Sequence, residues 1–262
     1  MIILVKCTES HREQLNIFLA NDPLYNTFIR SDIDIYGFDK SFQTLYMTTN
    51  NKGQCLFVIL IFHNIMILAG DRESLTINLV QSLLEDHIDI IMGKETLISQ
   101  CRSLLSHDFD YSQKSLYALT DKNYLLKNPV PATVAKTTDG KAIHQFLNTF
   151  SEFKAMYGSL EMILNRISGN EGQHLFYEVH GQLIAHGNTA ACTTDSCMIG
   201  GLATHENYRH QAYAKNILSQ LSWMALAAQQ TPCLLTDSYE GKSLFEDLGY
   251  ELQGRWASLR RR

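Results

Sequence analysis

A strand, a short polar connection and a helix follow one another between Gly200 and Ala214. Residues 200–204 are typical of a strand, residues 205–209 form the connection, and apolar residues at helical spacing begin at Ala214. The N-terminus of a helix binds pyrophosphate well, because its backbone N–H groups are unpaired and its dipole is positive. Small residues let the phosphate approach the backbone. The pattern predicts an anion-binding loop, and the alternative is an ordinary turn with Arg209 in solvent.

A second motif, Leu244-Phe245-Glu246-Asp247-Leu248-Gly249-Tyr250, lies downstream. Gly249 suits the left-handed position that ends a helix. The interval between the two motifs has room for one helix and one strand. Taken alone, the second motif predicts only an amphipathic helix that ends at a glycine.

Together these motifs resemble the GNAT superfamily of N-acetyltransferases. The family signature is Arg/Gln-x-x-Gly-x-Gly/Ala, preceded by a Tyr-Arg pair. The segment Tyr208-Arg209-His210-Gln211-Ala212-Tyr213-Ala214 fits this signature at Arg209 and Ala214. The downstream motif is similar to the family's Leu-Tyr-x-x-Leu-Gly-Phe. The resemblance covers residues 130–262 and extends to the first half only by the order of elements.

The resemblance implies that acetyl-coenzyme A is the cosubstrate. Backbone groups of Leu202 and Thr204 would pair with its pantetheine arm, and those of residues 210–215 would hold its pyrophosphate. The thioester would enter between two splayed strands, residues 200–204 and 234–236. The expected cofactor-binding residues are Leu202, Ala203, Thr204, Arg209, His210, Gln211, Ala212, Tyr213, Ala214, Lys215 and Ser238. For Ser238 a simple turn role is the alternative.

Two positions depart from the family pattern. Ala212 stands where glycine is usual, and alanine is acceptable there only if its φ is negative. Phe245 stands where many family members have the tyrosine that protonates the leaving thiolate, and phenylalanine has no proton to give. The sequence therefore supports cofactor binding more directly than acetyl transfer.

Acetyl transfer to an amine requires a neutral amine, a polarised carbonyl and a proton for the thiolate. We expect Glu178 as the base and Tyr239 as the acid. The alternatives for the base are His186, Asp195, His205 and Glu206, each of which could equally be structural or solvated. Tyr250 is a second candidate acid, although packing is its expected role.

Strand and helix signals occur in the same order in both halves of the chain. In the first half, strands are expected at 1–6, 55–60, 65–69, 88–91 and 115–119, and helices at 10–20, after Pro23, at 74–85 and at 95–105. In the second half, strands are expected at 133–136, 174–179, 183–191, 196–204, 233–236 and 251–259, and helices at 139–150, 158–167, 212–230 and 242–248. Such repetition indicates a duplicated fold.

We therefore expect an α/β fold (α+β, mixed sheet) of tandem GNAT-like domains, each a twisted, mostly antiparallel sheet flanked by helices. Pro129 and Pro131 disfavour a helix and suggest a boundary near residue 128. Residues 1–127 would form a degenerate GNAT-like domain, and residues 128–262 the acyl-coenzyme A binding GNAT domain. Asp71 and Glu73 would repel a pyrophosphate in the first half. An unrelated α+β domain is the alternative there.

Composition indicates which binding partners and which cellular compartment to expect. The chain has 262 residues, 45% of them hydrophobic and 19% charged, and a net charge of −5. This charge gives no general reason to expect binding to nucleic acid or to a membrane. The amino terminus lacks the features of a signal peptide, and the apolar stretch 55–69 is too short to span a bilayer.

Cysteine and histidine usage predicts no metal site. No two of the six cysteines have C-x-x-C spacing, and the ten histidines form no convincing metal set. Free thiols in a reducing cytoplasm are the simplest interpretation. We therefore expect a cytoplasmic protein without a metal, and leave open whether it forms a homodimer.

The leading hypothesis is an acyltransferase that moves an acetyl group from acetyl-coenzyme A to a primary amine of a small molecule or peptide. A non-catalytic acyl-coenzyme A binding or interaction protein is the second hypothesis, motivated by Ala212 and Phe245. A nucleotide-binding regulator that uses the same anion loop is the third.

Overall fold

The computed structural model divides into two compact units. It describes residues 2–71, 73, 77–154, 156–169 and 172–262. Unit 1 comprises Met1–Leu116 and Gln253–Arg262, and unit 2 comprises Tyr117–Leu252. This division differs from the boundary expected at 127/128, because two strands, β6 (Phe109–Leu119) and β12 (Tyr250–Arg261), each contribute to both units.

Unit 1 is built on a mixed sheet. Strands β1 to β4 pair antiparallel in chain order, and β4 pairs parallel with β5. The strand next to β5 is β12, which pairs with it antiparallel from Trp256 to Arg260. The strand bounds are β1 Ile3–Lys6, β2 Gln43–Thr49, β3 Cys55–Phe62, β4 Ile65–Gly70 and β5 Ile90–Lys94.

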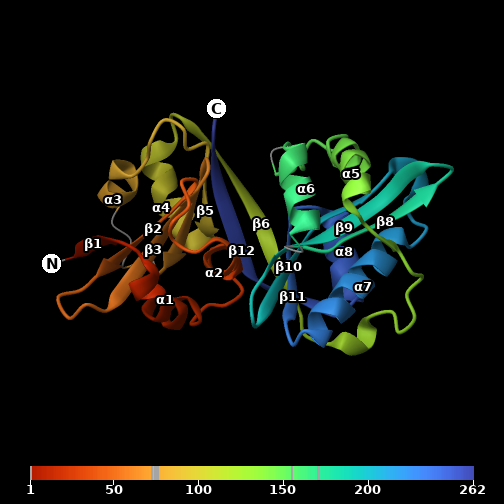
Figure 1. Ribbon diagram of the computed structural model, residues 1–262, viewed down its shortest axis with the longest axis horizontal. Helices are drawn as coiled ribbons and strands as arrows, with labels where there is room; N and C mark the ends of the chain where they lie inside the picture. The colour runs from red at the N-terminus through yellow and green to blue at the C-terminus, as the bar shows by residue number, and fades with distance from the viewer. Residues whose placement is uncertain (1, 72, 74–76, 155, 170–171) are drawn as a thin grey trace. The chain divides into compact units, whose positions relative to one another are not determined.

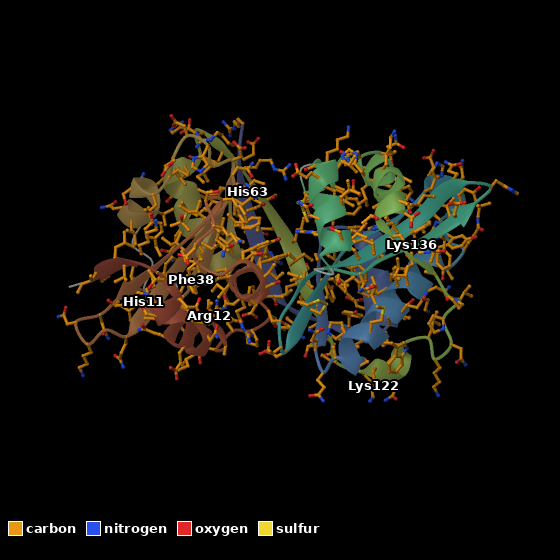
Figure 2. The ribbon with its side chains drawn as sticks, in the orientation of Figure 1. His11, Arg12, Phe38, His63, Lys122 and Lys136 are labelled. Atoms are coloured by element: carbon orange, nitrogen blue, oxygen red, sulfur yellow. A yellow bond between two sulfur atoms is a disulfide. The ribbon has the colours of Figure 1, made fainter. Side chains whose placement is uncertain are left out.

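In the described part of unit 1, four helices accompany the sheet: α1 Arg12–Leu19, α2 Thr27–Tyr36, α3 Ile77–Ser82 and α4 Glu95–Leu105. The first three residues of the helix expected at 74–85 lie outside the described residues. Leu97, Ile98 and Cys101 of α4 are fully buried in the core of this unit. Arg12, beside Phe38 in Figure 2, stacks its guanidinium 5.3 Å from the centre of that ring.

Unit 2 repeats the arrangement. Strands β7 to β10 pair antiparallel in chain order, β10 pairs parallel with β11, and β6 lies next to β11. The strand bounds are β7 Thr133–Val134, β8 His174–Val179, β9 Gln182–Cys192, β10 Ser196–Thr204 and β11 Thr231–Thr236. The helices are α5 Gly140–Leu147, α6 Leu160–Ser168, α7 Tyr213–Ala227 and α8 Tyr239–Asp247.

The order of elements is the same in both halves of the chain. Each half runs strand, two helices, three strands, helix, strand, helix, strand. The expected repetition and the mixed α/β fold are therefore confirmed. The closing strand of each half, however, is hydrogen-bonded next to the fifth strand of the other half, so that β12 follows β5 and β6 follows β11.

Helices cover both faces of the sheet of unit 2 (Figure 1). The apolar stripe of α7, which contains Ile217, Leu218 and Leu221, packs against β9, β10 and β11. At Gly187 of β9, a Cβ atom would lie 2.6 Å from Cγ2 of Ile217, so glycine permits this close approach. On the opposite face, Ile143 of α5 and Ile163 of α6 belong to a second core.

Candidate functional site

The pairing of the parallel strands β10 and β11 ends before the carboxyl end of β10. The paired residues run from Ser196 and Thr231 to Ile199 and Leu234. Beyond Ile199, the pairing of β10 with β9 shifts register between Gly200 and Ala203. Gly201, inside this bulge, has a φ of +56°. A β-bulge turns peptide groups out of the regular ladder and is frequent beside functional sites.

The connection from β10 to α7 is tightly turned. Residues 206–208 form a 3₁₀ turn, and the side-chain Nε of Arg209 donates to the carbonyl of Thr204 at 3.4 Å. His210 and Ala212 then adopt left-handed φ values of 60° and 63°. Helix α7 begins at Tyr213. The backbone N–H groups of its first turn are available to an anion, as at other helix N-termini.

Ala212 has a positive φ, which is the costly conformation for an alanine at this position. Its φ of 63° and ψ of 11° place it in the left-handed region. For a residue with a Cβ this costs roughly 1–2 kcal/mol. The strain explains why glycine suits this position. Ala212 also anchors the helix, because its carbonyl accepts from both the backbone N–H and the side-chain amide of Asn216, each at 2.9 Å.

The expected cofactor residues fall into three groups. Arg209 to Ala212 are exposed, and Tyr213 to Lys215 are half-buried in the first turn of α7. Leu202 and Thr204 are half-buried on β10, where the Oγ1 atom of Thr204 is buried and has no hydrogen-bond partner among the described residues. An orphaned hydroxyl at the base of the loop is consistent with a ligand that completes its hydrogen bonding.

Two of the expected residues have other structural roles. Ala203 is 7% exposed and packs in the core that contains Phe176 and Leu183. The hydroxyl of Ser238 caps α8, because it accepts from the N–H of Gly241 at 3.2 Å. The turn role weighed for Ser238 is thus the one that its hydrogen bond displays.

The two expected catalytic residues lie on different elements. Glu178 is exposed near the end of β8, and Tyr239 is 87% exposed at the first position of α8. Strands β9 and β10 lie between β8 and β11, the strand that leads into α8. The structure does not bring Glu178 and Tyr239 together. Of the other candidates, Asp195 accepts a hydrogen bond from Thr193 at 2.8 Å, and His186 is fully buried.

Phe245 and Tyr250 belong to the core. Phe245 is 6% exposed and packs against Tyr117, with ring centroids 6.1 Å apart. The hydroxyl of Tyr250 lies 2.7 Å from that of Ser222 in the interior, and burial raises the pKa of Tyr250. Tyr250 is therefore a packing residue and a poor acid at neutral pH.

A buried polar cluster lies on the side of β10 that faces α5 and α6. It consists of Tyr157, His174, His186 and Asn188, none more than 1% exposed. The hydroxyl of Tyr157 donates to Oδ1 of Asn188 at 2.9 Å, and the His174 and His186 rings are joined by a 2.9 Å nitrogen–nitrogen contact. Burial lowers the pKa of His174 to about 3 and that of His186 to about 4. Sequence reasoning named His186 alone, because nothing local shows that it meets the other three.

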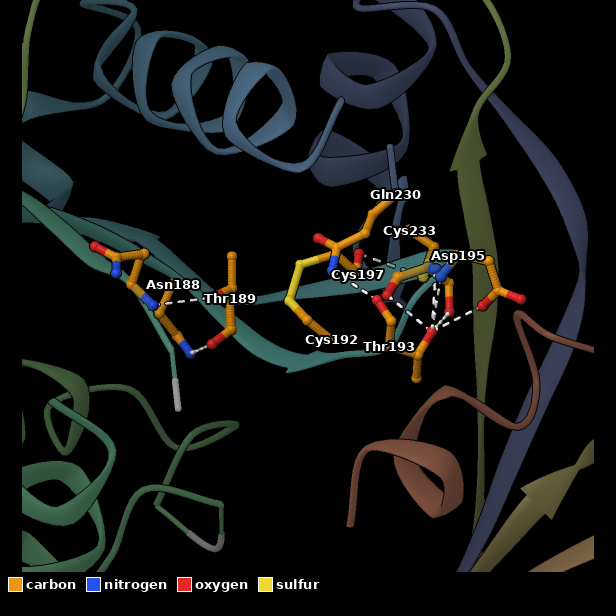
Figure 3. The surroundings of a disulfide bond; sticks show 10 residues. Asn188, Thr189, Cys192, Thr193, Asp195, Cys197, Gln230 and Cys233 are labelled. Atoms are coloured by element: carbon orange, nitrogen blue, oxygen red, sulfur yellow. Dashed lines mark hydrogen bonds between the residues drawn. A yellow bond between two sulfur atoms is a disulfide. The ribbon is translucent and has the colours of Figure 1, made fainter. Parts of the chain in front are cut away.

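A disulfide joins Cys192 of β9 to Cys197 of β10 (Figure 3). The expectation of free thiols is therefore wrong for this pair. The two residues are directly opposite in the antiparallel ladder, with Cα atoms 4.1 Å apart, so the hairpin brings them together without any C-x-x-C spacing. Among the described residues, Cys7, Cys55, Cys101 and Cys233 form no disulfide.

A small cavity in unit 1 lies at the ends of β4 and β5. Its volume is about 80 Å³, and its lining includes Tyr25, Asp22 and Lys94. The Lys94 ammonium and the Asp22 carboxylate are 2.8 Å apart. These opposite charges satisfy one another, so the cavity gives no clear indication of a ligand. The expectation that this half binds no coenzyme A stays a prediction.

The described residues contain neither a group of three or more side chains suited to a metal ion nor a helix long and apolar enough to cross a membrane.

Comparison with known proteins identifies the fold. No protein-family model matches the sequence, and no curated protein does so either. The chain is similar to the crystal structure of a GCN5-related N-acetyltransferase-like protein from Streptococcus suis, with a TM-score of 0.60 and 14% identity, over 96% of this chain and 99% of that one.

Two further structures are similar over nearly the whole chain. A tandem GNAT protein from the clavulanic acid biosynthesis pathway has a TM-score of 0.58 and 9% identity, over 99% of this chain and 98% of that one. A Drosophila protein has a TM-score of 0.71 and 10% identity, over 100% of this chain and 99% of that one. The chain has the GNAT fold, and at these identities the likeness concerns the fold alone.

Proposed function

We propose that this protein is an N-acetyltransferase that moves an acetyl group from acetyl-coenzyme A to a primary amine. The observation that carries the proposal is the continuous path from the β10 bulge through the left-handed residues His210 and Ala212 to the N-terminus of α7. Strain of this kind persists where the surrounding structure enforces it, which is frequent at ligand-binding loops.

The chain's own groups would act mainly by positioning. The N–H groups of residues 210–215 would bind the pyrophosphate, and the guanidinium of Arg209 would add positive charge. The Thr204 hydroxyl and the backbone of β10 would pair with the pantetheine arm. The N–H of Leu202 would donate to the thioester oxygen, which stabilises the negative charge that develops when the amine attacks.

The reaction would form a C–N bond and break a C–S bond, while one proton leaves the amine and one reaches the thiolate. Phe245 supplies no proton, and the exposed Tyr239 lies next to bulk water. Tyr239 would be the candidate acid, and water would be the alternative proton source for the thiolate. Glu178 is also exposed and would be the candidate base. The acceptor would be a small-molecule or peptide amine.

Calorimetric titration of acetyl-coenzyme A into the pure protein tests the cofactor step. We expect saturable binding that weakens by about three- to tenfold in Arg209→Gln and weakens further with added salt. A matched control is Arg255→Gln, because Arg255 lies on β12 and bonds to Gln113 of unit 1. Absence of binding by the native protein at millimolar ligand would exclude the proposed function.

A second candidate is a non-catalytic acyl-coenzyme A binding protein. The burial of Phe245 at the usual tyrosine position favours it. A thiol-release assay across a broad panel of amines separates the two functions. Binding without release for any amine would favour the binding protein, whereas turnover of one amine would reject it.

A further inference from the structure

Hydrogen bonds link the two buried histidines to each other and to the β10 bulge. Nδ1 of His186 lies 2.9 Å from the carbonyl oxygen of Gly201, and Nε2 of the same ring lies 2.9 Å from Nδ1 of His174. Both rings are buried, at 0% and 1% exposure. These two hydrogen bonds thus connect β8 and β9 to Gly201, the glycine of β10 that has a positive φ.

The hydrogen bonds determine where each proton sits. A carbonyl oxygen only accepts, so Nδ1 of His186 carries the proton. In the neutral ring its Nε2 is then an acceptor, and Nδ1 of His174 must donate to it. Nε2 of His174 is left as a buried acceptor with no partner among the described residues. Both rings therefore have the Nδ1–H form.

Gly201 is confined from several sides by the same cluster. A Cβ atom at Gly201 would lie 2.6 Å from Oδ1 of Asn188, 3.1 Å from the hydroxyl of Tyr157 and 3.2 Å from Cε1 of His186. These atoms fill the space on the α5 and α6 side. The Gly201 carbonyl is consequently fixed by His186, and the bulge has little freedom to rotate.

The carbonyl direction fixes the direction of the next N–H. The chain contains no cis peptide among its described residues, and in a trans peptide the C=O and N–H groups point in opposite directions. The N–H of Leu202 therefore points away from His186. The side chain of Leu202 packs near α7. A Cβ atom placed at Gly187 would lie 3.2 Å from Cδ1 of Leu202, 2.6 Å from Cγ2 of Ile217 and 3.3 Å from Cδ1 of Leu221, and the last two residues belong to α7.

We infer that His186, supported by His174, is a positioning residue that holds the Gly201–Leu202 peptide so that the Leu202 N–H donates to the carbonyl of a bound acyl thioester. This role rests on the proposed acetyl-coenzyme A function. A group fixed before the reaction needs no reorganisation as negative charge develops on the thioester oxygen, which is what makes such donors effective. His186 itself touches neither substrate.

The proton positions are tested first, without any ligand. Two-dimensional ¹H–¹⁵N spectra of the histidine rings of the full chain distinguish the two neutral forms. We expect both His174 and His186 in the Nδ1–H form at pH 7, assigned by the loss of each signal in His174→Asn and His186→Asn. A proton on Nε2 of His186 would overturn the inference, because the bond to Gly201 could not exist.

The positioning role is tested with three variants. His186→Asn keeps a side-chain N–H near the position of Nδ1, His186→Leu removes it, and His174→Leu removes only the support. The readout is the infrared stretch of the ¹³C-labelled thioester carbonyl in bound acetyl-coenzyme A. We expect the native shift to lower frequency to persist in His186→Asn, to diminish in His174→Leu and to vanish in His186→Leu.

Kinetics and a control complete the test. With an amine that is turned over, His186→Leu should lower kcat by about tenfold or more while KM changes by less than about threefold, since loss of one such donor costs at most about 10²–10³ in kcat. Ser222→Ala, which removes a buried hydroxyl bonded to Tyr250 on the other face, should keep the carbonyl shift. If His186→Leu does not fold, the graded comparison of His174→Leu with His186→Asn decides.

Two failures can be told apart. Absence of acetyl-coenzyme A binding by the native protein would exclude the proposed function and the positioning role with it. Native binding with an unchanged carbonyl shift in both leucine variants would leave the function intact and overturn the role of His186.

Discussion

The ring of Phe245 in α8 packs edge to face against the ring of Tyr117 in β6, with centroids 6.1 Å apart. The hydroxyl of Tyr117 donates to the carboxylate of Glu246 at 2.9 Å. A phenol is thus present beside Phe245, the position where many GNAT enzymes have a tyrosine, but it comes from a strand outside the segment that resembles the family. Burial, and then the hydrogen bond to the carboxylate, raise the pKa of Tyr117, which makes it a weak acid.

Restoring the family tyrosine should not restore an acid. In Phe245→Tyr the added hydroxyl enters a position that is 6% exposed. We expect thiol release to change by less than about twofold and the free energy of unfolding to fall by about 1–3 kcal/mol, the usual cost of an unpaired buried hydroxyl. Amine-dependent thiol release and urea unfolding measure the two effects. An increase in kcat of tenfold or more would contradict this view.

Ala212→Gly should stabilise the loop. Glycine removes the left-handed strain at φ 63°, and part of the gain is offset by the greater entropy of the unfolded chain. We expect an increase of about 0.5–1 kcal/mol in the free energy of unfolding, measured with urea. Ala227→Gly, at the exposed last residue of the same helix, should instead lower it by about 0.5–1 kcal/mol. Equal signs for the two variants would refute the assignment of strain.

The disulfide predicts a specific alkylation pattern. After unfolding without reductant, four of the six cysteines should react, and peptide mass spectrometry should find Cys192 linked to Cys197. In the double variant Cys192→Ser/Cys197→Ser, the free energy of unfolding should fall by about 2 kcal/mol, as expected for the loss of a disulfide that closes a short loop. Cys55→Ser, at a free half-buried thiol, provides the control. Six reactive thiols in freshly purified protein would contradict the bond.

The buried histidines should make the protein sensitive to acid. An unfolded histidine has a pKa near 6.5, about three units above the values near 3 and 4 in the folded state. Between these values the unfolded chain binds more protons, so the free energy of unfolding falls as the pH decreases from about 6.5 towards 3. The contribution is fully present above pH 6.5.

Urea unfolding at a series of pH values measures this slope. We expect His186→Asn to reduce it, because one of the two buried rings no longer titrates. Ser222→Ala, which removes a buried hydroxyl that does not titrate in this pH range, should leave the slope unchanged. A native slope equal to that of His186→Asn would show that the rings are not held neutral.

The sequence predicts elements best where local pattern and structure agree. Helix α4 and strand β10 have the expected bounds, because the spacing of their apolar residues indicates the same ends as the structure. Strand β2 is not among the expected strands. Its polar residues, three threonines and a glutamine, interrupt the alternation of apolar and polar residues that predicts a strand, and its pairing with β1 and β3 is not visible in the local sequence. The exchange of β6 and β12 depends on pairing between distant segments, which local propensity does not encode.

The candidate site divides in the same way. The order of strand, loop and helix around Arg209 follows from residue types alone. The sign of φ at Ala212, the register shift at Gly201 and the meeting of His174 with His186 depend on how three strands align. Those features require the fold and could not be read from spacing.

The exchanged closing strands constrain how the chain can be synthesised and cut. Unit 1 contains Gln253–Arg262, so the strand beside β5 becomes available only after residues 253–262 have been synthesised. A fragment that ends at residue 127 would lack that strand, and a fragment that begins at residue 128 would lack Tyr117 to Leu119 of unit 2. Cutting the chain between residues 127 and 128 would therefore separate each unit from strand residues that belong to it.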